Sequence, residues 1–485
     1  MPISMPPELP LSSEDWERTL PAVQALIVAL WEEVQALRVK VGELSERVGQ
    51  HSRNSSRPPS SDPPGAPERE RKVSGRKAGG QPGHRGEGRK LLPVEEVDEV
   101  VEVKPEVCGK CGHVLCGSDP DPARHQVTDL PPVVCTTTEY RLHTLGCPEC
   151  GEQTRAQLPD GVSWGRFGAR LQAMVAVLSG AYRLSKRNIA GILQDFFGVE
   201  MGLGTVSALE EATSAALEGV VEEARGYVRE QSVVNVDETG WKEGSKKGWL
   251  WVVVTRGVTV FVVRLSRGAK VVQELLGKAY GGMVGSDRWS GYSWVDVKRR
   301  QVCWAHLVRD FQGFVDRGGA SVRVGEGLLG QAEVLFRWWY RVRDGTLQRS
   351  SFRGYMGGVR KRVRELLREG EECAHPKTAR TCTNLLKVES ALWTFVRREG
   401  VEPTNNAVER AVRAGVLWRK GSFGTQSARG SRFVERMMTV VATLRQQERN
   451  VLDYVTAACQ AAIRGKAPPS LLPREALLGE LSQEA

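Results

Sequence analysis

The sequence lacks any apolar run of about 18 residues, the length that would cross a bilayer. It also lacks the basic-then-apolar start of a secretory signal, so we expect a cytoplasmic protein with no membrane partner. Its ten cysteines are spread over 485 residues, which argues against a disulfide framework. Acidic residues number 58 against 68 basic ones, and the net charge of +10 favours a polyanionic partner. This length predicts several domains.

The first organised segment carries an unbroken heptad pattern. Its apolar residues alternate spacings of four and three, at Val23, Ile27, Leu30, Val34, Leu37, Val41, Leu44 and Val48. Such a seam predicts a coiled coil within residues 1–52 that joins copies into a homo-oligomer. A single amphipathic helix packed on its own domain is the alternative.

The composition changes sharply after the heptads. Residues 51–90 are rich in Pro, Ser, Gly and Arg and hold ten Lys/Arg against four Asp/Glu. Such a segment cannot bury enough apolar surface to fold alone, so we expect a disordered basic linker over 53–95. Arg76, Lys77 and Arg85 are candidate phosphate contacts within it. A merely solvated linker is the plainer interpretation.

Two Cys-x-x-Cys-Gly turns follow, with 35 residues between their two cysteine pairs. Each turn aims two thiolates at one point, and two turns together complete a closed tetrahedral zinc site. The four ligands are Cys108, Cys111, Cys147 and Cys150. We therefore predict a zinc-ribbon-like module with structural zinc over 96–160. Four unpaired structural or redox thiols are the alternative.

Helical patterns dominate residues 161–228. A helix over 185–193, a turn with Gly198 and a second helix from Gly204 suit a helix-turn-helix that binds DNA. An ordinary helical hairpin fits the same pattern equally well.

Strand patterns begin at Ser232 and run to Cys303. We expect three antiparallel strands, a helix and two further strands, over 233–237, 249–255, 258–265, 269–276, 282–287 and 301–303. That order predicts an α/β, ribonuclease-H-like core, in which the ends of the first and fourth strands lie side by side. Asp237 and Asp287 stand at those ends, so we expect their carboxylates to meet.

A third acid is expected from a helix that starts after Pro403, with Thr404 as its cap. Asn405, Glu409 and Arg413 share one face of that helix at four-residue spacing. Three carboxylates suit two magnesium ions, with manganese as an alternative, for in-line phosphoryl transfer. A single acid in such a chain is more often a solvated surface charge.

These motifs together resemble those of transposases of the insertion-sequence-66 family. The matching segments are 54–62 (NSSRPPSSD), 79–86 (GGQPGHRG), the two Cys pairs, Asp237-Glu238-Thr239, Asp287 with Gly291-Tyr292, Cys303-Trp304-Ala305-His306, and Asn405-Asn406-x-x-Glu409-Arg410 with Arg413, Arg419 and Lys420. The resemblance implies that Asp237, Asp287 and Glu409 form the catalytic triad and bind the metals. It implies DNA contacts at Asn405, Asn406, Arg410, Arg413, Arg419 and Lys420. The role of Cys303 and His306 would be structural or DNA-facing, or simply that of a packed strand end.

The sequence thus predicts a multidomain transposase of a bacterial insertion sequence. The catalytic core is divided into 229–305 and 401–430, with a helical insertion over 306–400 and a helical region and tail over 431–485. The protein would cut double-stranded DNA at terminal inverted repeats and join the 3′-hydroxyls to target DNA, close to the nucleoid. The resemblance also implies small accessory proteins of the same element. An inactive remnant that only binds the ends and a plain metal-dependent nuclease are the rival hypotheses.

Overall fold

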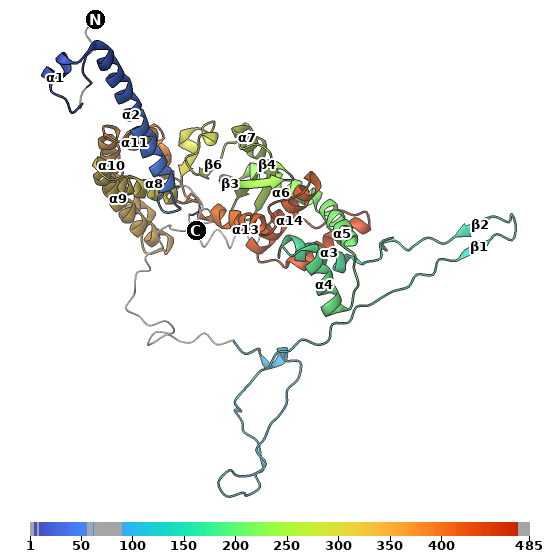
Figure 1. Ribbon diagram of the computed structural model, residues 1–485. Helices are drawn as coiled ribbons and strands as arrows, with labels where there is room; N and C mark the ends of the chain where they lie inside the picture. The colour runs from blue at the N-terminus through green and yellow to red at the C-terminus, as the bar shows by residue number, and fades with distance from the viewer. Residues whose placement is uncertain (1–3, 7–8, 56–61, 63–89, 474–485) are drawn as a thin grey trace.

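The structure is a computed structural model, and it describes residues 4–6, 9–55, 62 and 90–473. Arg76, Lys77 and Arg85 lie outside these residues. At the centre is a five-stranded mixed sheet in the order β5-β4-β3-β6-β7 (Figure 1). Its strands are β3 (Val233–Glu243), β4 (Lys246–Val254), β5 (Thr259–Arg264), β6 (Met283–Ser286) and β7 (Arg300–Val302). The expected α/β class is confirmed.

The sheet has an antiparallel half and a parallel half. β3, β4 and β5 pair antiparallel, whereas β6 runs parallel to β3 and β7 parallel to β6. β5 and the second half of β4 are runs of mostly valine and aromatic residues that are largely buried, whereas β4 begins with two exposed lysines. Branched and aromatic side chains fill a pleated surface well, and burial on both faces removes the need for alternating polar residues.

Helices cover the sheet and close its edge. α13 (Asn406–Ser422) contacts β3 and β4, and α14 (Ala428–Gln446) contacts β5. Three side chains of α14 spaced four apart accept the outward N–H groups of β5: Glu435 from Val263, Thr439 from Phe261 and Thr443 from Thr259. An open strand edge invites pairing with another chain, so this ladder protects the sheet.

Further helices surround the same core. They are α3 (Ala169–Gly180), α4 (Lys186–Phe197), α5 (Leu203–Ala216), α6 (Glu218–Glu230), α7 (Ala269–Leu276) and α15 (Val451–Ile463). α4 ends at Gly198, which has a φ of 63°, the left-handed conformation typical of a helix C-cap. α3, α4 and α5 share a small apolar core formed by Val175, Ile189, Leu193 and Val206. The pair α4 and α5 is where the helix-turn-helix was expected.

Residues 304–397 form a second, entirely helical body with its own apolar core. It consists of α8 (Trp304–Asp316), α9 (Ala320–Arg343), α10 (Arg349–Glu371), α11 (Pro376–Lys387), η5 (Glu389–Leu392) and α12 (Thr394–Arg397). It occupies the stretch expected for the insertion. The expected boundaries at 228/229, 305/306 and 430/431 shift, because they fall inside α6, α8 and α14, which are continuous.

The N-terminal helices are α1 (Ser13–Arg18) and α2 (Pro21–Val48). α2 projects from the body in Figure 1, and most of its heptad side chains are exposed. Its last turn is attached to the helical body, since the Glu46 carboxylate lies 2.9 Å from Arg317 and 2.7 Å from Lys377. Within the described residues no helix is long and apolar enough to cross a membrane.

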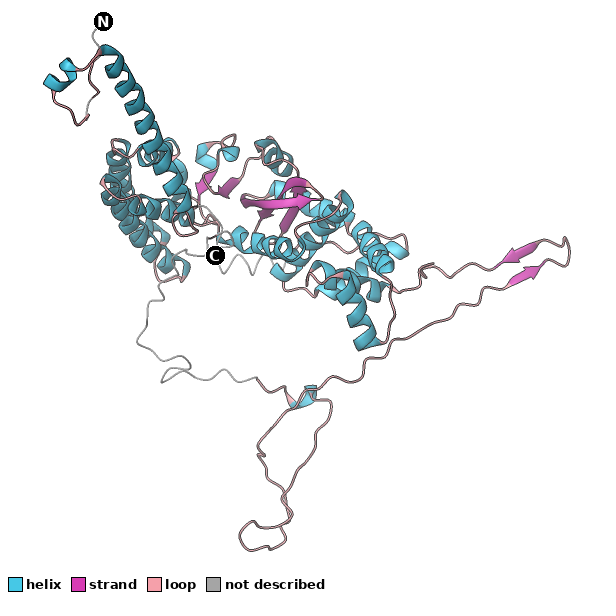
Figure 2. Cartoon of the chain, viewed as in Figure 1, coloured by secondary structure: helices cyan, strands magenta, loops and turns pink. Residues whose placement is uncertain are grey.

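Little regular structure occurs between residues 90 and 168. It holds η2 (Val94–Glu96) and a two-stranded ribbon of β1 (Thr144–Gly146) and β2 (Gln153–Arg155). Figure 2 shows this ribbon at the end of an extended arm, well away from the central sheet.

Candidate active site

Asp237 and Asp287 are brought together by the register of the parallel strands. β3 pairs with β6 through Val233↔Met283, Val234↔Val284 and Asn235↔Gly285. Each aspartate stands two residues beyond the last of these pairs. The expectation that the first and fourth strands are neighbours is therefore confirmed. β3 does not end at Asp237, however, because its continuation to Glu243 remains paired with β4.

Backbone amides orient both aspartates. The N–H of Glu238 donates to Asp237 Oδ1 at 2.9 Å. The N–H of Trp289 donates to Asp287 Oδ1, also at 2.9 Å. These bonds leave the second oxygen of each carboxylate, Oδ2, for another partner.

Glu409 reaches the same region from the first turn of α13. The helix is attached to β3 by Asn405, whose Nδ2 donates to the backbone oxygen of Val236 at 3.0 Å. Asn405 occupies the N-cap position, and its side chain makes no capping hydrogen bond. The expected cap at Thr404 is therefore wrong. Instead of capping the helix, the amide side chain at the N-cap joins it to the residue before Asp237.

The carboxylates repel one another. Burial raises the pKa of Asp237 well above its usual range, and the charges of Glu238, Asp287 and Glu409 raise it further. Burial and the charge of Asp287 also raise the pKa of Glu238. Like charges this close disfavour full ionisation unless a cation joins them. The group therefore has the electrostatics of a cation site.

Glu238 is a buried acid that the sequence analysis did not single out as a site residue. Successive residues of a strand point to opposite faces, so Glu238 turns away from Asp237. Its side chain, 2% exposed, lies 2.7 Å from Arg267 and accepts the Tyr292 hydroxyl at 2.9 Å. Arg267 is in turn stacked against Trp289, with its guanidinium carbon 4.7 Å from the ring centre. The sequence offered one signal for Glu238, namely its position next to Asp237 in a strand.

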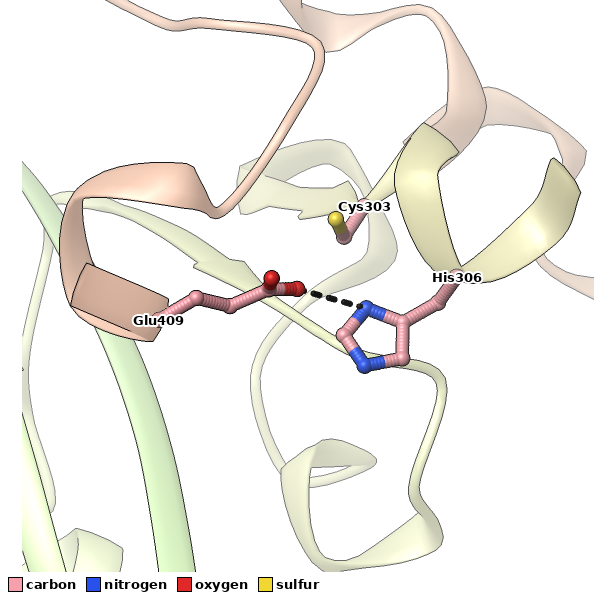
Figure 3. Close-up of side chains that lie close together, drawn as sticks. All are labelled: Cys303, His306 and Glu409. Carbon is pink, nitrogen blue, oxygen red and sulfur yellow. Dashed lines mark ion pairs between the residues drawn. The ribbon is translucent and has the colours of Figure 1, made fainter. Parts of the chain in front are cut away.

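Cys303 and His306 lie against Glu409 (Figure 3). The Nδ1 of His306 is 3.5 Å from Glu409 Oε1, and Arg309 Nη2 is 3.3 Å from the same oxygen. Cys303 Sγ accepts the N–H of Asn405 at 3.2 Å. Burial raises the pKa of Cys303 to about 11, and burial together with Arg309 lowers the pKa of His306. Both side chains are therefore neutral at pH 7.

Comparison with known families shows which family the chain belongs to. The family described as Transposase IS66 family matches residues 164–432, more than half of the 485 residues. The chain belongs to the IS66 family of transposases. The match contains all three acids together with Cys303 and His306. A second family, described only as a family of unknown function (DUF6444), matches residues 13–90. No curated protein matches the chain.

The DNA contacts expected on and next to α13 differ in their exposure to solvent. Asn406, Arg410, Arg413 and Lys420 are exposed along α13. Arg419 is half-buried and donates to the backbone oxygen of Gly240. Asn405 is 1% exposed, so it offers no surface to DNA in this conformation and serves as the link to β3 described above.

The four cysteines of the expected zinc module form two separate turns. In each turn backbone N–H groups lower the pKa of the first thiol: those of Lys110 and Cys111 act on Cys108, and those of Cys150 and Glu149 on Cys147. Such turns favour the thiolates that zinc requires. Among the described residues only Cys303, His306 and Glu409 gather three ligand atoms within 4.8 Å, so neither the four sulfurs nor one oxygen each from Asp237, Asp287 and Glu409 come that close together. Zinc binding at these cysteines stays a prediction.

Proposed function

We propose that this IS66-family transposase cuts DNA at the ends of its element and joins the freed 3′-hydroxyls to target DNA. The proposal is supported by one observation: Asp237 and Asp287 follow paired residues of β3 and β6, and the charges of Asp287 and Glu409 both raise the pKa of Asp237. The strand order, with three antiparallel strands followed by two parallel ones on the other side of β3, supports a ribonuclease-H-like core.

The chemistry of the side chains fits divalent cations. Asp237, Asp287 and Glu409 offer the hard oxygen ligands that magnesium or manganese prefers. Burial and, after it, the charges of Glu238 and Asp287 raise the pKa of Asp237, and a cation would offset this repulsion. When bound, two such ions activate the attacking oxygen and stabilise the leaving one. The backbone amides of Glu238 and Trp289 hold the aspartates in place for this purpose.

The exposed side chains of α13 supply the contacts to DNA. Arg410, Arg413 and Lys420 follow Glu409 along the helix and are free to approach phosphates next to the cleaved bond. The basic segment before residue 90 adds charge that holds the polyanion. α4 with α5 and the Cys-containing arm would recognise the terminal repeats, the latter with structural zinc.

Self-association through α2 would bring two element ends into one complex. The heptad residues of this helix are mostly exposed, and none of them joins the apolar cores of the described residues. Burial against the same seam of a second copy removes that surface from water. We therefore propose a homo-oligomer, acting on bacterial DNA, with accessory proteins of the element as further partners.

The test is excision and reintegration in cells of a marker flanked by the DNA that borders the gene. Glu409→Gln removes one ligand charge with little change of shape, and Glu402→Gln, an exposed acid on the loop before α13, is the matched control. We expect movement with wild type and Glu402→Gln and none with Glu409→Gln. Equal movement by Glu409→Gln would contradict the assignment. Binding of the ends without movement by any form would favour a binding-only remnant.

A further inference from the structure

Cys303, His306 and Glu409 form a ligand group of a different chemical character from the three acids. Cys303 is the residue before α8 and His306 lies in its first turn, so both side chains project to the same side. Glu409 faces them from the first turn of α13, as Figure 3 shows. One atom from each residue lies within 4.8 Å of the other two. The group thus presents sulfur, nitrogen and oxygen to one point.

His306 and Glu409 lie close together without a hydrogen bond between them. Nδ1 of His306 is buried and makes no hydrogen bond, although Glu409 Oε1 is 3.5 Å away. A hydrogen bond to nitrogen is normally about 2.7–3.2 Å long. A buried polar atom without a partner is costly, and a cation placed between the two groups would satisfy both.

We propose that Cys303, His306 and Glu409 bind a thiophilic divalent ion of the zinc class. Sulfur and imidazole ligands favour zinc or cobalt over magnesium, and three protein ligands leave a fourth position for water. The thiol of Cys303 releases its proton to solvent as the sulfur–metal bond forms. The Glu409 side chain is 30% exposed, which gives the ion a path of entry.

The ligand atoms need only a small movement to close around the ion. Metal–ligand distances of about 2.0–2.3 Å place tetrahedral ligand atoms roughly 3.5 Å apart. The present separations of up to 4.8 Å therefore shrink by about an ångström, which rotation of the long Glu409 side chain and of the imidazole can supply. Arg309, now 3.3 Å from Glu409, would move away as the ion takes its place.

An ion bound by Cys303, His306 and Glu409 would inhibit the reaction. Glu409 would then be withdrawn from the set that holds magnesium, so zinc acts as an inhibitor that competes for one shared carboxylate. This consequence rests on the proposed function, whereas binding of the ion itself does not. The two parts are tested separately.

Binding is tested on the full chain with cobalt as the probe. Cys303→Ser keeps an oxygen that accepts the N–H of Asn405 and removes the thiolate. Cys459→Ser, also buried and remote from Glu409 in sequence, is the control. Every form keeps the four cysteines of the expected zinc module, Cys108, Cys111, Cys147 and Cys150. Any cobalt bound by them is therefore the same in all three forms. We expect Cys303→Ser to lose one bound cobalt and its share of the sulfur-to-cobalt absorption, and Cys459→Ser to lose neither. Equal binding by all three forms would overturn the proposal.

Inhibition is tested by adding zinc to magnesium-supported cleavage of DNA carrying the element end. Each form is compared with its own rate without zinc. Cys303→Ser should need at least about ten times more zinc for half-inhibition, because loss of even an outer partner of a metal ligand costs about 10–100-fold in metal affinity. Equal zinc sensitivity of wild type and Cys303→Ser would exclude the inhibitory role. If wild type shows no magnesium-supported cleavage at all, the proposed function is wrong. The cobalt experiment still tests ion binding by Cys303, His306 and Glu409 in that case.

Discussion

The side-chain amide of Asn405 donates to the backbone oxygen of Val236, the residue immediately before Asp237. This bond joins the helix that carries Glu409 to the strand that carries Asp237. Asn405 and Val236 are 169 positions apart in the sequence. The relative position of the two acids therefore depends on this hydrogen bond.

Asn405→Ala should therefore reduce cleavage far more than folding. Displacement of a catalytic group by about an ångström can cost on the order of 100-fold in rate, whereas loss of one buried hydrogen bond costs about 1–3 kcal/mol of stability. Cleavage rates and denaturant unfolding of the purified protein measure the two effects. Asn384→Ala, which removes an exposed amide of α11, should change neither. Unaltered cleavage by Asn405→Ala would show that the link does not position Glu409.

The acid cluster predicts an unusual pH dependence of stability. Since the pKa of Asp237 is raised in the folded state, the folded protein holds a proton that the unfolded chain has lost. Without added divalent metal, the free energy of unfolding should fall as pH rises from about 4, the ordinary value, through the raised pKa. Asp237→Asn should remove much of this slope and be more stable than wild type at pH 7. Thermal unfolding across pH measures it, and a steeper slope in Asp237→Asn would be the contrary result.

Arg309 forms an ion pair with Glu409, which we propose as a metal ligand, and would therefore compete with a metal ion. Its guanidinium lies 3.3 Å from the carboxylate, and both side chains are about three-quarters buried. Arg309→Gln should lower the magnesium concentration needed for half-maximal cleavage by roughly fivefold, the equivalent of one ion pair of about 1 kcal/mol. Arg323→Gln, on the exposed surface of α9, serves as the control. A higher magnesium requirement would mean that Arg309 assists the metals instead.

The seam of α2 predicts self-association through one face of that helix. Leu37 lies on the seam and is 54% exposed, while Val39 lies off it and is 65% exposed. Leu37→Asp would place a charge inside the coiled coil and should shift the protein toward monomer. Val39→Asp adds the same charge outside the seam and should leave the assembly intact. Sedimentation measures the mass of each form, and an identical shift by both substitutions would exclude the seam as the interface.

Much of the central sheet could be predicted from local patterns. The helix α7 has the expected bounds, Ala269–Leu276, because its apolar periodicity is uninterrupted. The pairing of β3 with β6 was expected because the order of the elements is that of a ribonuclease-H-like fold, in which the first and fourth strands lie side by side. The continuation of β3 to Glu243 was missed, since its polar residues resemble a loop and only pairing with β4 makes them a strand.

Contacts between distant segments account for the remaining differences. The link from Asn405 to Val236 and the pair of Glu238 with Arg267 join residues that no local period relates. The hydrogen bonds that Thr439 and Thr443 accept from β5 could not be predicted either, because the sequence around these residues has only the pattern of an ordinary helix. The role of Cys303 and His306 stayed open in the sequence because their spacing does not say that Glu409 faces them.

The central claim is that Asp237, Asp287 and Glu409 act as one metal-binding unit. Its most direct test is the cleavage rate of the purified transposase on DNA carrying the element end, with magnesium, for Asp237→Asn, Asp287→Asn and Glu409→Gln singly and in pairs. Groups that act as a unit are not additive, so each single substitution should abolish cleavage and the pairs should be no worse. If any one of the three retained a rate within about tenfold of wild type, a loss of at most about 1.4 kcal/mol in the barrier, the claim would be contradicted.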